Sequence, residues 1–269
     1  MKKILILFST AVLLASCSAK SLLKPDPEVR ESGTVSVSAT ISADHIWSGN
    51  DAIGIYGTVK GTNARFVPFS SCLGKDGQAT LYGSAVDGEL VAYYPYSYGG
   101  VPTLTEGLVV LPQIQSYCRD AFSQIISNTV AVARGKEEVF DLDFLVGAVH
   151  FKVSAKFSGD VKSVTLSSIS DVLSGEMSID DGSMSERGLK SVAVRGIGRP
   201  EGEFDLWVML PVGNYSGLEM TIISDEGSVV KSVRGSIPVE KGRVSETVVK
   251  DEAFEYAGSD YEVIPGIFD

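Results

Sequence analysis

Val149-His150-Phe151-Lys152-Val153-Ser154-Ala155-Lys156-Phe157 is the stretch of this chain that decides its fold. Apolar and polar side chains alternate along all of it. Successive side chains of a β-strand point to opposite faces of a sheet, so this period of two predicts a strand with one buried and one solvated face. The same alternation occurs at residues 35–41, 204–210 and 218–223.

Further strands and turns follow from local composition. Residues 53–56 and 129–133 are predicted strands, and the apolar run at 90–94 predicts a strand buried on both faces that ends at Pro95. Asp-Gly or Glu-Gly pairs at 76–77, 87–88, 181–182 and 226–227 are typical of tight turns. Only residues 120–126 favour a short helix. Many short strands separated by turns predict an all-β antiparallel sandwich or barrel.

The N-terminal residues have the layout of an export signal. Met1-Lys2-Lys3 precedes an apolar run at residues 4–15, which is shorter than the ~20 residues needed to span a bilayer. The run closes on Leu14-Ala15-Ser16-Cys17, which resembles the lipobox of bacterial lipoproteins. That resemblance implies cleavage before Cys17 and acylation of its thiol, so acyl chains would anchor the mature chain to a membrane. The alternative is an ordinary secretory signal with a chance cysteine.

The net charge limits the classes of partner that we expect, and two further cysteines leave the redox state open. The chain has 34 acidic and 23 basic residues and a net charge of −11, which disfavours nucleic acid as a partner. Residues 18–32 are polar, with Pro25 and Pro27, and are predicted to form a tether. Cys72 and Cys118 could pair outside the cytoplasm or remain thiols, and spacing does not decide between the two.

The residues offer little for catalysis. The only histidines are His45, expected in a loop or at a strand edge, and His150, expected in solvent on the polar phase of its strand. Two histidines are too few for a zinc site, and no serine lies in a nucleophile elbow. Asp141 and Asp143 alternate on one strand face and are expected to be surface charge rather than a glycosidase pair. We therefore expect no enzyme, no metal and no cofactor.

Five segments, in their order along the chain, resemble the fimbrillin and Mfa-like pilin superfamily, whose members are type V pilus subunits of Gram-negative anaerobes. One is the Trp, Gly-Asn-Asp and Ile-Gly-Ile-Tyr pattern at 46–56, where Asn50 is an insertion relative to the family. The others are Val-Ala-Tyr-Tyr-Pro-Tyr at 91–96, Leu-Pro-Gln-Ile-Gln at 111–115, the strand at 143–153, and the closing hairpin at 238–244.

The resemblance implies two tandem transthyretin-like Greek-key β-sandwich domains. The expected organisation is a signal peptide at 1–16, a tether at 17–34, an N-terminal domain at 35–136, a C-terminal domain at 137–250 and an acidic aromatic tail at 251–269. It also implies an outer-membrane-anchored lipoprotein at the cell surface that becomes a structural or adhesive pilus subunit. Expected partners are other pilin subunits by strand exchange, the membrane through acyl chains, and a host or bacterial surface ligand.

Family members lose an N-terminal strand to a protease with trypsin-like specificity. Here the strand at 35–41 is the candidate for displacement, and Arg30 and Arg65 are the candidate processing sites. Cleavage after Arg30 would leave that strand in place, so an anchor or tip role stands beside a shaft role. For both arginines a solvated loop position is the alternative. The tail at 251–269 is a second candidate donor strand, with a frayed terminus as its alternative.

A cluster of tyrosines supports a competing interpretation. Tyr94, Tyr96 and Tyr98 are candidate ligand-facing aromatics, because aromatic rings stack on sugars. The alternatives to a pilus subunit are therefore a surface glycan-binding lipoprotein with β-sandwich domains and a partner-binding scaffold lipoprotein outside any pilus.

Overall fold

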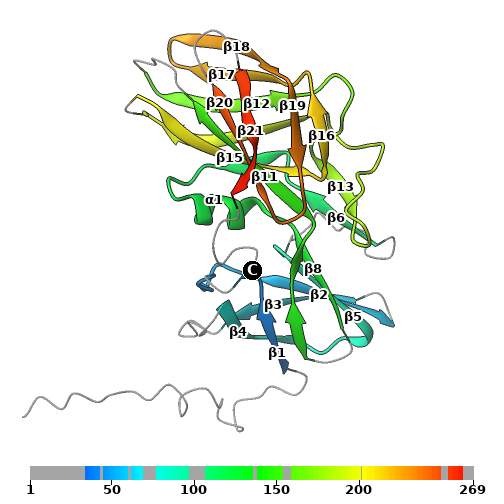
Figure 1. Cartoon of the computed structure of the whole chain (residues 1–269). Helices are drawn as coiled ribbons and strands as arrows, with labels where there is room; N and C mark the ends of the chain where they lie inside the picture. The colour runs from blue at the N-terminus through cyan, green and yellow to red at the C-terminus, as the bar shows by residue number, and fades with distance from the viewer. Residues whose placement is uncertain are drawn as a thin grey trace, which may run out of the picture. The chain divides into compact units, whose positions relative to one another are not determined.

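A computed structural model describes residues 34–42, 45–59, 62–68, 77–96, 107–135, 138–153, 159–200, 202–249 and 254–262 (Figure 1). The signal peptide, Cys17, the tether, Arg30, Cys72 and Tyr98 lie outside these residues. Every described element is a strand except α1 (Ala121–Asn128), so the predicted all-β, sandwich-like fold is confirmed. In the described part of the chain, no helix has the length and apolar content needed to cross a membrane.

The first large sheet is built mainly from the N-terminal half of the chain and is closed on itself. Its order is β10-β8-β5-β2-β3-β4-β1-β9, so β9 and β10 lie at opposite ends although only Leu142 separates them in sequence. The segment they form pairs with β1 on one side and β8 on the other. The strands are β1 (Thr34–Thr40), β2 (Ile53–Val59), β3 (Thr62–Pro68), β4 (Gln78–Ser84), β5 (Asp87–Tyr94), β8 (Ala131–Gly135), β9 (Val139–Asp141) and β10 (Asp143–Phe144).

The second large sheet has the order β15-β11-β20-β21-β18-β17-β12-β14-β7. Two small antiparallel pairs accompany it, β6 (Leu108–Leu111) with β13 (Gly175–Ser178) and β16 (Gly213–Ser216) with β19 (Ser236–Val239). The nine strands are β7 (Ile114–Ser116), β11 (Val146–Val153), β12 (Val161–Ser167), β14 (Ser191–Gly198), β15 (Phe204–Pro211), β17 (Glu219–Ser224), β18 (Gly227–Arg234), β20 (Val244–Val249) and β21 (Phe254–Glu262).

Two clusters of buried apolar side chains form the core. The first gathers most of the buried side chains of the first sheet and extends to Met209 and Val244 of the second, and the second cluster belongs to the second sheet and the β16–β19 pair. Strand β11 contributes to both: Val146 and Ala148 belong to the first cluster, and Val149, Phe151 and Val153 to the second. The strand predicted at residues 149–153 is confirmed, with Val149, Phe151 and Val153 buried as predicted, although His150 on the other face is buried as well. The predicted short helix is also confirmed as α1. It begins after Asp120 because the Asp120 carboxylate caps it, accepting a 2.8 Å hydrogen bond from the Ser123 amide.

Strand direction and one turn differ from the sequence prediction. Four strand pairs are parallel, namely β1–β9, β11–β20, β7–β14 and β18–β21. Alternation marks which face is buried but carries no direction, so the sequence could not distinguish these pairs. Asp87 and Gly88, predicted to form a turn, are instead the first two residues of β5. Gly88 has φ 102°, and the pairing of β5 with β2 shifts register nearby, between Gly57 and Val59. A bulge uses the same positive-φ glycine as a turn.

Candidate functional site

Strand β1 is the N-terminal strand of the described chain, and its apolar face packs into the first core. Val37 and Ala39 are 5% and 0% exposed, and Ile41, just after the strand, is also buried. On one side β1 neighbours β4. On the other it pairs in parallel with the three residues of β9, where the Ser38 amide donates to the Glu138 carbonyl and the Leu142 amide to the Thr40 carbonyl, both at 2.7 Å. A short ladder therefore holds a strand whose side chains are central to the core.

Removal of β1 would leave a defined acceptor site for another β-strand. The apolar sites of Val37, Ala39 and Ile41 would open, and the backbone groups of β4 and β9 that face β1 would lose their partners. Unpaired strand edges and an exposed apolar groove are the two features that another extended strand can satisfy together. We take the β1 position as the candidate functional site for this reason.

The second sheet lacks a comparable open edge at β15, because a side chain closes it. The Gln115 amide group, on β7, donates from Nε2 to the Met209 carbonyl at 2.8 Å and accepts from the Met209 amide at 2.9 Å. The backbone of β7 meanwhile pairs with β14. Gln124 of α1 donates to the neighbouring Trp207 carbonyl at 2.6 Å. Side-chain amides thus occupy the outward backbone groups of β15 at Trp207 and Met209, where an incoming strand would otherwise bind.

A third carboxamide holds β7 itself. Asn128 accepts from the Ser116 amide at 2.7 Å and donates to the Ser116 carbonyl at 2.8 Å, which reproduces a backbone pairing with a side chain. In the sequence Gln115 stands out only as part of a family-like pattern, and nothing there predicted the roles of the three carboxamides. Their one sequence signal is the presence of Gln115, Gln124 and Asn128 close to apolar residues that are expected to be buried.

The candidate processing residue Arg65 lies inside a strand. It is exposed on β3, and its register partner on β2 is Gly54. Cleavage after Arg65 would separate β1 and β2 from the rest of the chain and cut β3 in two. That is a larger loss than one displaced strand.

The tyrosines do not share one exposed surface. Tyr94 is 5% exposed and donates from its hydroxyl to Asp51 Oδ1 at 3.0 Å. Burial, together with the negative charge of Asp51, raises the pKa of Tyr94. Tyr93 is also buried, while Tyr96 is half-buried with its ring 6.4 Å from that of Tyr93.

The loop that follows β1 is anchored by aromatic packing. His45 lies in this loop, as expected, but is 6% exposed, with its ring 4.7 Å from Trp47 in an edge-on arrangement. Its Nε2 lies 3.9 Å from Asp51 Oδ2 and makes no hydrogen bond within the described chain. Burial lowers the pKa of His45, and the Asp51 carboxylate opposes this only in part. Trp47 is fixed by a 2.7 Å bond from its Nε1 to the Gly77 carbonyl.

The expectation that His150 is solvated is wrong. His150 is 7% exposed and stacks on Trp207 with ring centres 4.5 Å apart and planes 3° from parallel. Its Nε2 is 2.8 Å from Asp205 Oδ1, and its Nδ1 is 3.4 Å from Glu246 Oε1. The alternation placed His150 correctly on the outer face of β11, but its cross-strand neighbours on β15 and β20 cover it there. The described residues hold no group of three or more His, Cys, Asp or Glu side chains arranged to bind a metal ion.

No protein-family model matches this chain, and neither does any curated protein. Several solved structures, in contrast, match this chain. A candidate cell adhesion protein from Bacteroides ovatus is similar with a TM-score of 0.53 and 16% identity, over 87% of this chain and 98% of that one. The tip fimbrial protein Mfa3 from Porphyromonas gingivalis, with a C-terminal truncation, has a TM-score of 0.36 and 10% identity over 85% and 99% of the two chains.

A fimbrial assembly protein from Parabacteroides distasonis has a TM-score of 0.37 and 11% identity, over 80% of this chain and 90% of that one. Of these three proteins, the Bacteroides ovatus adhesion candidate is similar enough to show a shared fold. The solved structures that resemble this chain include fimbrial proteins and candidate cell adhesion proteins.

Proposed function

We propose that this chain is a structural and adhesive pilus subunit, exported as a lipoprotein and assembled by β-strand donation at the position of β1. The observation that carries the proposal is the geometry of β1. It is an N-terminal strand whose Val37 and Ala39 side chains are buried in the first core, and β9, its partner on one side, has only three residues. The fold shared with a candidate adhesion protein supports it. The other subunits would be its partners.

We further infer two tandem transthyretin-like domains at 35–136 and 137–250. The separate core clusters support this division, although β9, β10 and the start of β11 contribute to the first cluster. Lipid attachment at Cys17 would hold the subunit at the outer membrane, and the absence of Lys and Arg at 42–47 favours an anchor or tip role over a shaft subunit that loses β1 by cleavage. The glycan-binding alternative gains no support from Tyr93 and Tyr94, which are buried.

A reducible disulfide between β1 and β9 would hold β1 in place, and it therefore tests strand donation at this position. Ser38 and Val139 are register partners on the outer face of β1 and β9, and neighbouring strands are ~4.8 Å apart, within disulfide range. The double variant Ser38→Cys, Val139→Cys in the full chain should therefore fasten β1 when oxidised. On incubation at high protein concentration, the wild type and the reduced variant should give SDS-resistant ladders on unheated gels, whereas the oxidised variant should remain monomeric.

The two single-cysteine variants are the matched controls, because each carries one of the changes and cannot form the disulfide between β1 and β9. They should form ladders under both oxidising and reducing conditions. Ladders from the oxidised double variant, or none from the wild type, would contradict assembly at the β1 position.

A further inference from the structure

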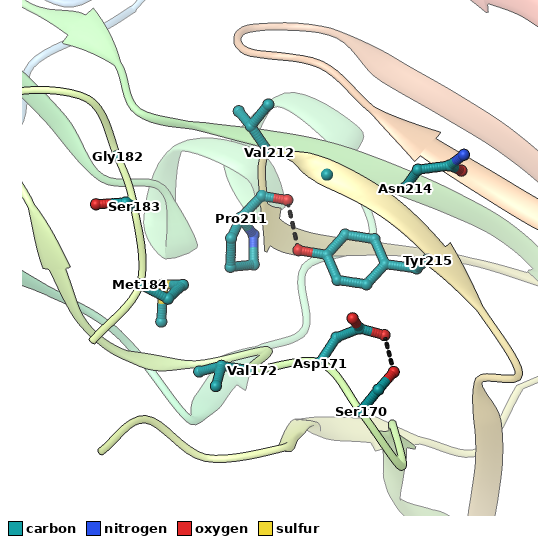
Figure 2. Close-up of a pocket in the computed structure, with 11 residues that line it drawn as sticks. Ser170, Asp171, Val172, Gly182, Ser183, Met184, Pro211, Val212, Asn214 and Tyr215 are labelled. Atoms are coloured by element: carbon teal, nitrogen blue, oxygen red, sulfur yellow. Dashed lines mark hydrogen bonds between the residues drawn. The ribbon is translucent and has the colours of Figure 1, made fainter. Parts of the chain in front are cut away.

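A pocket of about 440 Å³ lies at the end of β15 in the second sheet, and none of its described lining residues belongs to β1 (Figure 2). Its described lining residues come from three segments: residues 170–172 after β12, residues 182–184 after β13, and residues 211–215, which run from the end of β15 into β16. Its volume lies within the ~300–1,000 Å³ of typical small-ligand sites. The pilus proposal assigns this pocket no role.

Apolar groups form much of the wall. Val172, Met184, Pro211 and Val212 line the pocket together with the ring of Tyr215. The Tyr215 hydroxyl donates to the Pro211 carbonyl at 2.8 Å, as the dashed line in Figure 2 shows, so the phenol is fixed with its polar end already bonded. Burial, and then the negative charge of Asp171, raise the pKa of Tyr215. The ring is therefore a neutral wall close to one carboxylate.

Asp171 supplies the charge in this pocket, and its orientation is set by its own loop. Its Oδ2 accepts from the Ser168 hydroxyl at 2.9 Å and from the Ser170 hydroxyl at 2.8 Å. The Asp171 amide donates back to Ser168 Oγ at 2.9 Å. Oδ1 makes no hydrogen bond or ion pair with any described residue. A half-buried carboxylate is thus held in place with one oxygen unused.

None of the described residues that line the pocket is basic. Lys190 is tied to this loop, but its ammonium group donates to the Ile169 carbonyl at 2.7 Å rather than to Asp171. Removing a carboxylate from water without a cation is costly, and a charge-assisted hydrogen bond from a cation to Oδ1 would offset that cost.

We propose that this pocket binds an alkylammonium or alkylguanidinium group, with its methylene stem against the apolar wall and its charged head on Asp171 Oδ1. Lysine and arginine side chains have this form, an apolar stem that ends in a cationic donor. The same chemistry occurs in free polyamines. The proposal does not depend on strand donation, so it stands or fails separately from the pilus function.

Methionine methyl NMR on the labelled full chain can report binding, because Met184 lines the pocket and Met220 is buried in β17. The probes are N-acetyl-lysine amide, N-acetyl-arginine amide, spermidine and the uncharged N-acetyl-norleucine amide. The charged probes should shift the Met184 signal saturably and leave Met220 unchanged. Tighter binding of the amino acid amides indicates a protein side chain as the natural ligand, and tighter binding of spermidine indicates a free polyamine.

Asp171→Asn should weaken binding of the charged probes by about tenfold or more, because the head group loses its anion. The amide oxygen of asparagine still accepts from Ser168 and Ser170, so the loop should keep its shape. Glu219→Gln removes an equal charge at an exposed position of β17 and should leave binding unchanged.

Two results would overturn the proposal: equal Met184 shifts with N-acetyl-norleucine amide, or unchanged affinity in Asp171→Asn. The Met177 methyl, which is fully buried, reports whether that variant folds. If it does not fold, salt provides the test on the wild type. Raising ionic strength from about 0.05 to about 0.5 M should weaken the binding of the charged probes, and affinity that is independent of salt would contradict an ion-pairing pocket.

Discussion

His45 is a buried titratable side chain whose environment favours its neutral form. Its Nε2 faces Asp51 at 3.9 Å without a hydrogen bond, and burial lowers its pKa from the ordinary value of 6.5. A histidine with a lowered folded pKa binds its proton more readily after unfolding, so its contribution to stability is present above pH 6.5 and is lost as the pH falls below it.

We therefore predict that the free energy of unfolding declines as the pH falls from about 7.5 to about 5, and that His45→Phe makes this decline shallower. Phenylalanine keeps a ring beside Trp47 but does not titrate. Urea denaturation at a series of pH values measures the difference. The interpretation would be wrong if His45→Phe had the same pH dependence as the wild type, since the carboxylates, including Asp51, are present in both proteins.

Strand β7 is an element that depends on side chains more than on its own ladder. Gln115 is completely buried and satisfies both backbone groups of Met209. Its replacement by alanine leaves these groups without partners in the core, at about 1–3 kcal/mol for an unsatisfied group. We predict that Gln115→Ala lowers the free energy of unfolding by about 2–4 kcal/mol in urea denaturation.

The matched control is Gln113→Ala, two residues away, because the Gln113 side chain is exposed and only its carbonyl is used, by the Ala193 amide. It should change stability by less than about 0.5 kcal/mol. Equal losses in the two variants would mean that the Gln115 amide does not hold β15.

These elements also show what the sequence could and could not predict. The strands at 35–41, 53–56, 90–94, 149–153 and 204–210 were predictable, because each has a local pattern of burial. The partner of each strand was not, since β1 pairs with β9 about a hundred residues away and β7 is joined to β15 through the side chain of Gln115. The burial of His150 was also out of reach, because it depends on Trp207 and Glu246 being its neighbours across two different strands.

Taken as a whole, the molecule closes its two large sheets in different ways. The first is closed by backbone pairing of β9 and β10, with β1 next to the closure, and the second by β7 and buried carboxamides. Local opening requires few contacts to be broken where a ladder is short. The first closure should therefore open more readily than the second, and it should do so at β1, which is where strand donation would need it.

Hydrogen exchange followed by mass spectrometry tests this difference, and Ala39→Leu sharpens it. Ala39 is fully buried, so a larger side chain overpacks the β1 site, at about 1–3 kcal/mol. Exchange at 34–41 and 138–142 should accelerate by about tenfold or more in the variant, while β12 and β17 should keep the wild-type rate. Ser38→Leu adds bulk to the outer face of the same strand and should have a much smaller effect. Equal acceleration in β12 and β17 would show that β1 does not open by itself, and that its loss unfolds both cores together.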